Sequence, residues 1–275
     1  MSMKKCVITG GNSGIGKAAA IDLAKQGLEI IIFARESQKS DEAIIEIISE
    51  SGNEKVRHIK VDLSEVASIK EACKQVGSEY STIDYLINNA GVLKRKTSSN
   101  SKGIEQTFAV NYLAPFLTSR LLLEKLQSSE NGRIINVTSA LYKKGKLTQS
   151  VIPEDQKYNG SQAYADSKLL VLLDTLYLSR EYAKTNLSIN CMHPGVVGTD
   201  VFRDYPKWFA SLINMMITKP EKAGRSLSSL VTDFELFPES GQYYNINKLE
   251  PVKDLENLLS QYKPLMTETK NLVAI

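Results

Sequence analysis

The sequence predicts a single α/β domain, a doubly wound, seven-stranded parallel sheet with helices on both faces. Short apolar runs alternate with longer helical patterns, and most of these runs are apolar at consecutive positions. Strands that are apolar on both faces are typical of a parallel sheet covered by helices on both sides. The chain has 275 residues, 42% of them hydrophobic, and no linker or repeat divides it, so we expect residues 1–275 to share one core.

The elements follow one another in regular order. The predicted strands are the apolar runs CVIT (6–9), EIIIFA (29–34), VRHIKVD (56–62), DYLINNAG (84–91), GRIINVTS (132–139), LSINCMHPG (187–195) and GQYYNIN (241–247). The helices predicted between them cover Gly16–Gln26, Ser40–Glu50, Val66–Glu79, Gly103–Leu126, Ala163–Lys184 and Glu221–Thr232. Insertions near 141–162 and 200–219 interrupt the alternation after the fifth and sixth strands. Ligands bind beyond the carboxyl ends of parallel strands, so both insertions are expected on the substrate side.

Charge and cysteine content exclude several classes of function. The 34 basic and 31 acidic residues are interspersed and the net charge is +3, which argues against a nucleic-acid partner. Cys6, Cys73 and Cys191 are far apart and the only histidines are His58 and His193, so we expect neither a disulfide framework nor a metal site. The N-terminus carries no long apolar run. We therefore expect a cytoplasmic protein without a secretion signal or an integral membrane segment.

The stretch GGNSGIGKA after the first predicted strand has two interpretations. From Gly11 it nearly matches G-x-x-x-x-G-K-[ST], the phosphate loop of ATP- and GTP-binding proteins. Ala18 stands where that loop needs a hydroxyl for magnesium, which weakens this interpretation, although Asp62 could supply a magnesium carboxylate. From Thr9 the same letters give T-G-x-x-x-G-x-G, a turn under a dinucleotide pyrophosphate. Glycines there would allow a tight turn, close backbone approach and helix packing, at Gly10, Gly14 and Gly16.

Further motifs follow this loop in chain order. They are NNAG (88–91), VNYLAPF (110–116), NVTS (136–139), YADSK (164–168) and HPGVVGTD (193–200). Together with TGGNSGIG, they resemble the short-chain dehydrogenase/reductase family over nearly the whole chain. SGIGKA, FARE, the long interval from Ser139 to Tyr164 and MHPGVVGTD are most similar to its retinol-dehydrogenase-like, or WW-domain-oxidoreductase-like, branch. The resemblance implies a Rossmann fold in which one dinucleotide-binding and catalytic domain transfers a hydride between a nicotinamide cofactor and a carbonyl/alcohol pair.

The pattern Y-x-x-x-K occurs three times, so its context must select the catalytic pair. Tyr142 with Lys146 lies in a Lys/Gly-rich loop, and Tyr244 with Lys248 lies in a predicted strand, where positions four apart are too distant to meet. The pair at 164 and 168 opens a helical pattern, which places both side chains on one face. We hypothesise that the lysine ammonium and the charge of the oxidised nicotinamide lower the phenol's pKa from about 10 toward neutrality. The tyrosine would then serve as general acid and base.

The resemblance assigns the catalytic roles to Ser139, Tyr164, Lys168 and Asn111. Tyr164 would protonate the carbonyl oxygen as hydride reaches carbon, while the Ser139 hydroxyl hydrogen-bonds that oxygen. In the family, the asparagine that matches Asn111 holds a water that links the lysine to solvent. Two alternatives stay open: Thr138 could replace Ser139, and Asn111 could be a buried, satisfied helix asparagine.

The end of the second strand bears on the choice of cofactor. NAD enzymes place a carboxylate there, whereas this chain has Arg35, which favours NADP(H) over NAD(H). A charge-assisted bond to the extra phosphate is worth about 1.5–3 kcal/mol. Glu36 would repel that phosphate if it pointed inward, and Lys17 could add a second cation. Arg35 could alternatively be a solvated strand-end charge.

The resemblance also implies which residues surround the cofactor. Asp62 would meet the adenine amino group, Asn88 and Ala90 would line the adenosine side, and Thr199 would bond the nicotinamide amide. The full implied set is Gly10, Asn12, Ser13, Gly14, Ile15, Gly16, Arg35, Asp62, Leu63, Asn88, Ala90, Gly91, Tyr164, Lys168, Pro194, Gly195, Val197 and Thr199, and it contains no metal ligand.

Two other features have competing interpretations. Cys191 and His193 alternate onto one strand face and could suggest a thiolate and base, but packing is the favoured interpretation. WFASLINMM (208–216) is either core helix or an apolar lid, and a lid would suit a lipophilic or aromatic small-molecule substrate.

Two alternative functions share some of these features. A sugar-nucleotide epimerase shares the tyrosine and lysine but has a different glycine loop, and a non-catalytic NADP-binding scaffold or redox sensor would not need the intact catalytic residues. The helices from Gly103 and Ala163 carry apolar residues beyond one stripe. Because family members commonly dimerise through the corresponding helices, we expect a homodimer.

Overall fold

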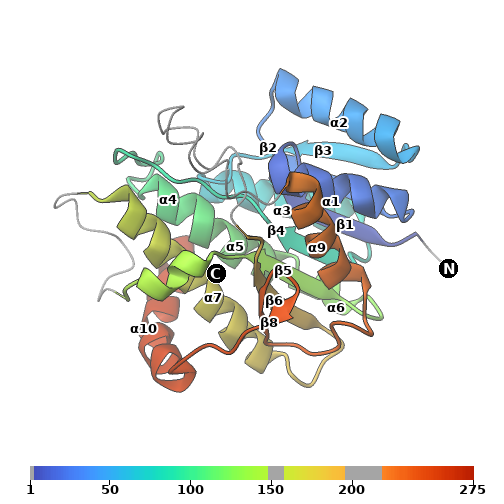
Figure 1. Cartoon of the computed structure of the whole chain (residues 1–275). Helices are drawn as coiled ribbons and strands as arrows, with labels where there is room; N and C mark the ends of the chain where they lie inside the picture. The colour runs from blue at the N-terminus through green and yellow to red at the C-terminus, as the bar shows by residue number, and fades with distance from the viewer. Residues whose placement is uncertain (1–2, 148–157, 196–218) are drawn as a thin grey trace.

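The computed structural model describes residues 3–147, 158–195 and 219–275. Its centre is an eight-stranded sheet with the order β3-β2-β1-β4-β5-β6-β7-β8 (Figure 1). The strands are β1 (Lys5–Thr9), β2 (Glu29–Ala34), β3 (Val56–Lys60), β4 (Tyr85–Asn88), β5 (Arg133–Val137), β6 (Ser188–His193), β7 (Tyr243–Asn245) and β8 (Lys248–Leu249). The seven predicted strands form the parallel part. The two-residue β8 was not predicted and pairs antiparallel with β7.

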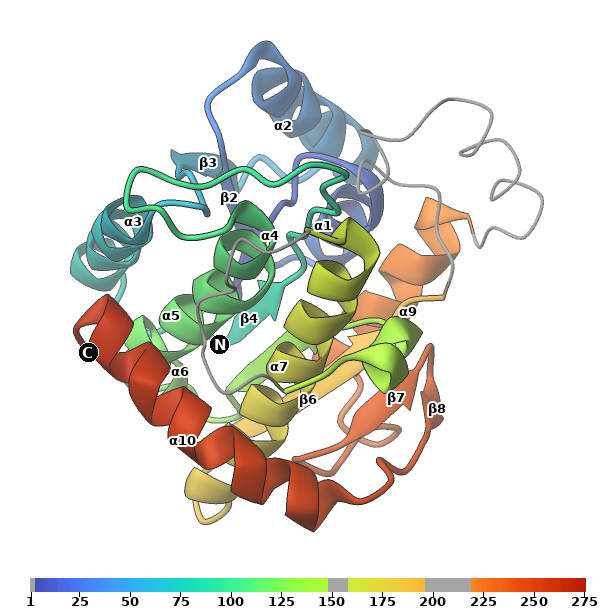
Figure 2. The ribbon, with the colours of Figure 1, turned by 90° about the vertical axis from the view of Figure 1, so that its left-hand side faces the viewer.

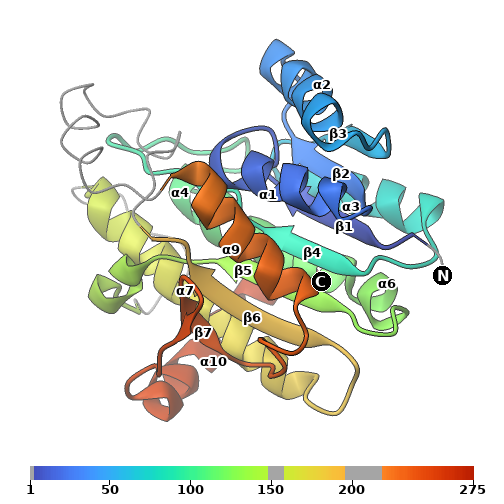
Figure 3. The same ribbon diagram turned by 45° about the vertical axis from the view of Figure 1, so that its right-hand side comes forward.

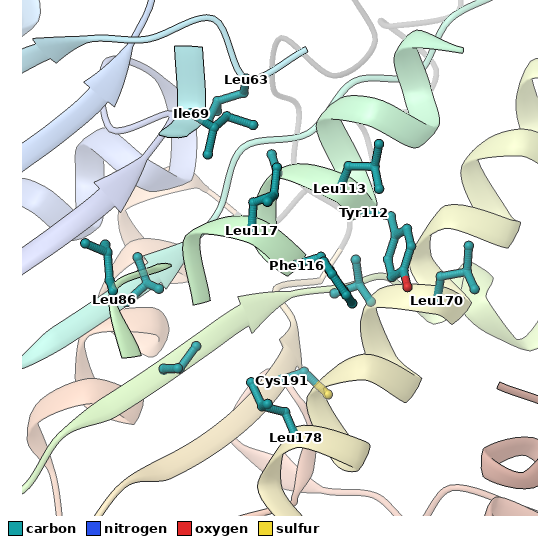
Figure 4. Packing of buried hydrophobic residues seen from close by; sticks show 14 of the residues in the cluster. Leu63, Ile69, Leu86, Tyr112, Leu113, Phe116, Leu117, Leu170, Leu178 and Cys191 are labelled. Carbon is teal, nitrogen blue, oxygen red and sulfur yellow. The ribbon is translucent and has the colours of Figure 1, made fainter. Parts of the chain in front are cut away.

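Helices cover both faces of the sheet because its strands are apolar on both. Ile30 and Ile32 of β2 pack into one core, and Ile31 and Phe33 pack into the other. The first core lies under α1 (Gly14–Lys25), α2 (Gln38–Ser51) and α9 (Pro220–Thr232) (Figure 3). The second lies under α3 (Val66–Glu79), α5 (Ala114–Leu121), α6 (Leu123–Gln127) and α7 (Gly160–Glu181), where aromatic and aliphatic side chains interlock (Figure 4).

The helix predicted over Gly103–Leu126 is divided into several pieces. It begins as α4 (Gln106–Phe108), because the Glu105 carboxylate accepts the Thr107 and Phe108 amides at 2.8 Å each. It continues as a π-helix, η1 (Ala109–Leu113), and then as α5 and α6. The prediction of one continuous helix was therefore wrong.

A long C-terminal helix, α10 (Leu255–Val273), was not predicted at all. It lies across α7 on the side of the second core (Figure 2). The spare apolar face on which the homodimer prediction rested is thus packed against the chain's own α10. Across residues 3–147, 158–195 and 219–275, no helix has the length and apolar character needed to cross a membrane.

The predicted insertions are only partly described. The first begins with a 3-10 helix, η2 (Ala140–Lys144), and its residues 148–157 lie outside the described residues. The second, at 200–219, and the segment WFASLINMM also lie outside them, apart from Lys219.

Close packing of α1 against α9 positions the glycine loop. A Cβ atom at Gly224 of α9 would lie 2.5 Å from the Ala18 Cβ and 2.8 Å from backbone atoms of α1. Ala18, the residue that weakened the ATP interpretation, is therefore a small contact between two helices.

We predict opposite effects of two helical glycine substitutions. Gly224→Ala should lower the free energy of unfolding by about 1–3 kcal/mol, because the new methyl group meets backbone. Gly77→Ala is the matched control, since its Cβ would meet only the Lys125 Cε, at 3.8 Å. It should raise stability by about 0.5–1 kcal/mol. Urea unfolding checks both, and an unchanged midpoint for Gly224→Ala would contradict the packing argument.

Candidate active site

A cavity of about 830 Å³ lies at the carboxyl ends of the parallel strands. It brings together most of the predicted site residues, namely Gly10, Asn12, Ser13, Gly14, Ile15, Arg35, Asp62, Leu63, Ala90, Gly91, Ser139, Tyr164, Lys168, Pro194 and Gly195. Gly16, Asn88 and Asn111 do not line it. Val197 and Thr199 fall outside the described residues, so their predicted contacts stay predictions.

The glycine loop has the three properties expected of it. Gly10 and Gly14 take positive φ values of 66° and 54°, which other residues rarely adopt. A Cβ at Gly16 would collide with the Gly10 carbonyl oxygen and the Asn89 side chain, so its glycine allows α1 to pack closely. Ser13 precedes α1 without capping it through its side chain. The amides of the first turn therefore have no intrahelical acceptor and face the cavity end of the helix.

The prediction for Asn88 is corrected. Its side chain points into the core, where Nδ2 donates to Asn136 Oδ1 at 2.8 Å and Oδ1 accepts from Thr118 Oγ1 at 2.7 Å. The next residue, Asn89, lines the cavity instead and donates to the Thr9 carbonyl at 3.1 Å. Two consecutive residues at a strand end point in opposite directions, which explains why the motif alone could not separate them.

Ser139, Tyr164 and Lys168 converge at the inner end of the cavity. Ser139 follows β5, and its side chain lies close enough to the Tyr164 phenol to oppose the rise in the phenol's pKa. Lys168 Nζ donates to the Val137 carbonyl at 2.9 Å and lies 5.7 Å from the centre of the Tyr164 ring. Their spacing on α7 places the tyrosine and lysine on one face, as predicted.

The other two Y-x-x-x-K pairs do not reach the cavity. Tyr142 is buried in η2, with its ring 5.2 Å from that of Tyr243. Tyr244 and Lys248 belong to β7 and β8. The choice of the central pair therefore agrees with the structure.

Burial controls the pKa values of Tyr164 and Lys168. Desolvation raises the pKa of Tyr164 to about 12, and the hydrogen bond with Ser139 only partly opposes this. Desolvation also lowers the pKa of Lys168 to about 8. From the sequence we predicted a lowered phenol pKa, through the lysine ammonium and the charge of the oxidised nicotinamide together. Among the protein's own residues, the net effect is a raised phenol pKa, because the loss of solvent outweighs the effect of Ser139.

Asn111 lies behind the cavity, in the π-helix η1. Its Oδ1 accepts from the Val92 amide at 2.7 Å, and its Nδ2 donates to the Val92 carbonyl at 2.9 Å and to Ser167 Oγ at 3.1 Å. A Cβ at Gly91 would lie 3.4 Å from both Asn111 Oδ1 and Lys168 Nζ. Asn111 thus joins the loop after β4 to α7, close to the lysine, and its amide is hydrogen-bonded within the protein.

Basic residues gather at the other end of the cavity, after β2. Arg35 is exposed and lines the cavity, as does Lys39 from the first turn of α2. Glu36 forms an ion pair of 2.5 Å with Lys60, and that hydrogen bond and charge lower the Glu36 pKa. Lys17, the predicted second cation, instead pairs with Glu46 at 2.5 Å and does not line the cavity. Lys39 takes the place expected for Lys17, and its position beside a strand-end arginine was the signal that sequence analysis missed.

Cys191 and His193 differ in their surroundings. Cys191 is buried in the same core cluster as Leu178 (Figure 4), and burial raises the pKa of its thiol, which agrees with the packing interpretation. His193 lines the cavity, and burial lowers its imidazole pKa. Its Nδ1 is buried and has no hydrogen-bond partner among the described residues. His193 therefore contributes a polar side chain to the cavity, and the interpretation of His193 as a packing residue is incomplete.

We predict that Lys168 titrates close to pH 8. Below that pH its amine carries a proton, and above it the buried amine is neutral, whereas an ordinary lysine has a pKa of 10.5. Carbon NMR of protein labelled at lysine Cε should show one resonance with a midpoint near 8. Lys168→Met identifies it by removing it. A Lys168 midpoint near 10.5 would show that desolvation does not control this group.

Comparisons with known proteins agree with this geometry. The family model for short chain dehydrogenase matches residues 4–209. Human retinol dehydrogenase 13 is 33% identical over 264 residues, covering 92% of this chain and 80% of that protein. Human retinol dehydrogenase 14 is 32% identical over 269 residues, covering 91% and 80%.

Solved structures share the fold. An uncharacterized protein from Mycobacterium paratuberculosis has a TM-score of 0.75 at 23% identity, covering 99% of this chain and 94% of that one. A short chain dehydrogenase from Shigella flexneri, solved in complex with NADP, has a TM-score of 0.70 at 21% identity, covering 89% and 97%. The six sequence motifs, the sheet order and these relatives lead to one conclusion, that the chain belongs to the retinol-dehydrogenase-like branch of the short-chain dehydrogenase family.

Proposed function

We propose that this short-chain dehydrogenase transfers a hydride between NADP(H) and a lipophilic carbonyl/alcohol pair, with Tyr164 as general acid and base. The observation that supports this most directly is the convergence of Ser139, Tyr164 and Lys168 in one cavity with the glycine loop. When bound, the nicotinamide supplies or accepts the hydride.

The protein's own residues handle the proton and the substrate oxygen. Tyr164 keeps its proton at neutral pH, because its pKa is about 12, and can donate it to a carbonyl oxygen. Ser139 offers a second hydrogen bond to the same oxygen. Alcohol oxidation needs the phenolate instead. Its rate should therefore rise with pH more steeply than that of carbonyl reduction.

The described residues fit a dinucleotide with an additional phosphate. The uncapped first turn of α1 and the glycines at φ 66° and 54° suit a pyrophosphate. Arg35 and Lys39 suit the phosphate on the ribose, and the exposed ion pair with Lys60 offsets part of the charge of Glu36, which also lines the cavity. This supports NADP(H) over NAD(H).

Several apolar side chains line the cavity among the described residues, namely Val92, Leu93, Val110 and Leu141, and the polar side chains of Gln106 and His193 line it too. Such a lining favours a lipophilic or aromatic molecule that presents one further polar group.

The cofactor assignment predicts an effect of Arg35 that is specific to NADPH. Arg35→Ala should weaken NADPH binding about 10- to 100-fold and leave NADH binding nearly unchanged, because only NADPH carries the ribose phosphate. Lys17→Ala is the control, since Lys17 pairs with Glu46 away from the cavity. Calorimetric titration measures both variants with both cofactors and with magnesium-ATP. Equal losses for NADPH and NADH would contradict the assignment, and tight ATP binding would revive the phosphate-loop interpretation.

The catalytic assignment predicts that Tyr164→Phe separates binding from turnover. The variant should bind NADPH like the wild type but reduce carbonyl substrates at least about 100-fold more slowly, because the proton donor is lost. A screen of aromatic and aliphatic aldehydes and ketones, followed by NADPH absorbance, measures this. Wild-type protein that binds NADPH yet turns over none of them would favour the scaffold or redox sensor instead.

A further inference from the structure

The C-terminal helix α10 is built into the core beside the catalytic helices. Its inner face is buried, through Leu259, Tyr262, Leu265, Met266, Thr269 and Val273. The apolar side chains on this face belong to the same core cluster as those of α3, α5 and α7. In Figure 2, α10 runs diagonally across α7 toward α5 and α6. The apolar outer surface of this helical layer is therefore covered from within the chain.

A buried polar network joins α10 to two neighbouring elements. The Tyr262 hydroxyl donates to Asp174 Oδ1 at 2.7 Å and lies 2.9 Å from the Tyr112 hydroxyl. The Tyr112 hydroxyl also lies 3.2 Å from Thr269 Oγ1. Arg120 completes the network with two bonds to the Asp174 carboxylate, at 2.7 and 2.9 Å.

Loss of any of these hydrogen bonds would destabilise the folded protein, because the groups that form them are buried. The side chains of Arg120 and Asp174 are only 10% and 5% exposed. A buried carboxylate needs several donors to offset its loss of solvent, and Tyr262 is one of three hydrogen bonds that reach this one. The network therefore ties the position of α10 to that of Asp174.

The network connects with the elements of the active site. Tyr112 directly follows Asn111 in η1. Asp174 lies on α7, the helix that carries Tyr164 and Lys168. Each of these elements thus has a hydrogen bond to the same tyrosine of α10.

Both ends of α10 are also anchored. Near its start, Glu256 pairs with Arg180 at the end of α7, at 2.5 Å. At its end, Lys70 of α3 donates to the Val273 carbonyl at 2.7 Å. A cation at the carbonyl end of a helix satisfies acceptors that have no intrahelical donor.

We propose that α10 is an internal support that holds η1 and α7 in place for catalysis and closes this face to a second copy of the chain, so that the enzyme acts as a monomer. Tyr262 and Asp174 are positioning residues in this arrangement. The homodimer predicted from the apolar helices is not expected through this face. The statement about catalysis rests on the proposed function, whereas the statements about structure and assembly do not.

The test compares Tyr262→Phe with Tyr177→Phe. The first removes the hydroxyl that bridges Asp174 and Tyr112 while keeping the ring. The second removes a hydroxyl from the same aromatic cluster, 6.1 Å away between ring centres. Hydrogen exchange followed by mass spectrometry should show amides of residues 109–113 and 164–174 exchanging at least about fivefold faster in Tyr262→Phe than in Tyr177→Phe. Thr269→Val, which loses the longer contact, should show a smaller increase and serves if Tyr262→Phe does not fold.

Two further measurements complete the test. Light scattering at micromolar concentration should give the mass of one chain, 30.5 kDa, and twice that mass would overturn the monomer. In an active wild type, Tyr262→Phe should lower kcat and leave the Kd for NADPH unchanged.

The outcomes separate the two proposals. Equal exchange in the two tyrosine variants, or faster exchange with unchanged kcat, would overturn the supporting role. Faster exchange and a monomer in a protein that reduces no carbonyl would support the internal support and count against the proposed function alone.

Discussion

The hydrogen bond between the Asn88 and Asn136 side chains links the two strands that lead to the loop at 89–91 and to Ser139. These residues pair across β4 and β5, and their amides meet at 2.8 Å in the core. Asn136 also donates to Thr175 of α7 at 2.8 Å, and Asn88 accepts from Thr118 of α5. An unpaired amide in this apolar interior would cost about 1–3 kcal/mol, so the two strands and two helices have a single arrangement that satisfies all four groups. The loop at 89–91, Ser139 and the catalytic stretch of α7 follow from that arrangement.

Much of the fold could be predicted because its signals are local. Consecutive apolar residues indicated the buried parallel strands, and the glycines of the first loop indicated its turn. The division of the helix at 103–126 could not be predicted, because a π-turn changes the backbone without changing which residues are apolar. The helix α10 could have been found. Leu255, Leu258, Leu259, Tyr262 and Leu265 repeat at helical spacing, but Pro264 lies within the pattern and suggests an interruption.

For the candidate active site, too, some properties could be predicted from the sequence and others could not. That Tyr164 and Lys168 share one face of a helix could be predicted, since they stand four residues apart in a helical pattern. Their titration could not, because desolvation depends on the atoms that surround Tyr164 and Lys168 after folding. The choice between Lys17 and Lys39 likewise depends on a distant partner. Lys17 pairs with Glu46 away from the cavity, whereas Lys39 lines the cavity.

The π-helix η1 has a consequence for how this chain can vary in length. Its backbone bond from Ala114 to Ala109 spans five residues instead of four, so the segment holds one residue more than an α-helix would need. Removing that residue would restore regular α-helical winding with the flanking turns in nearly the same register, but it would remove the widened turn that presents Asn111. Asn111 would then turn away from Val92, Ser167 or both. Selection in this segment should accordingly act on the number of residues as strictly as on their identity, so that gaps between homologues fall elsewhere.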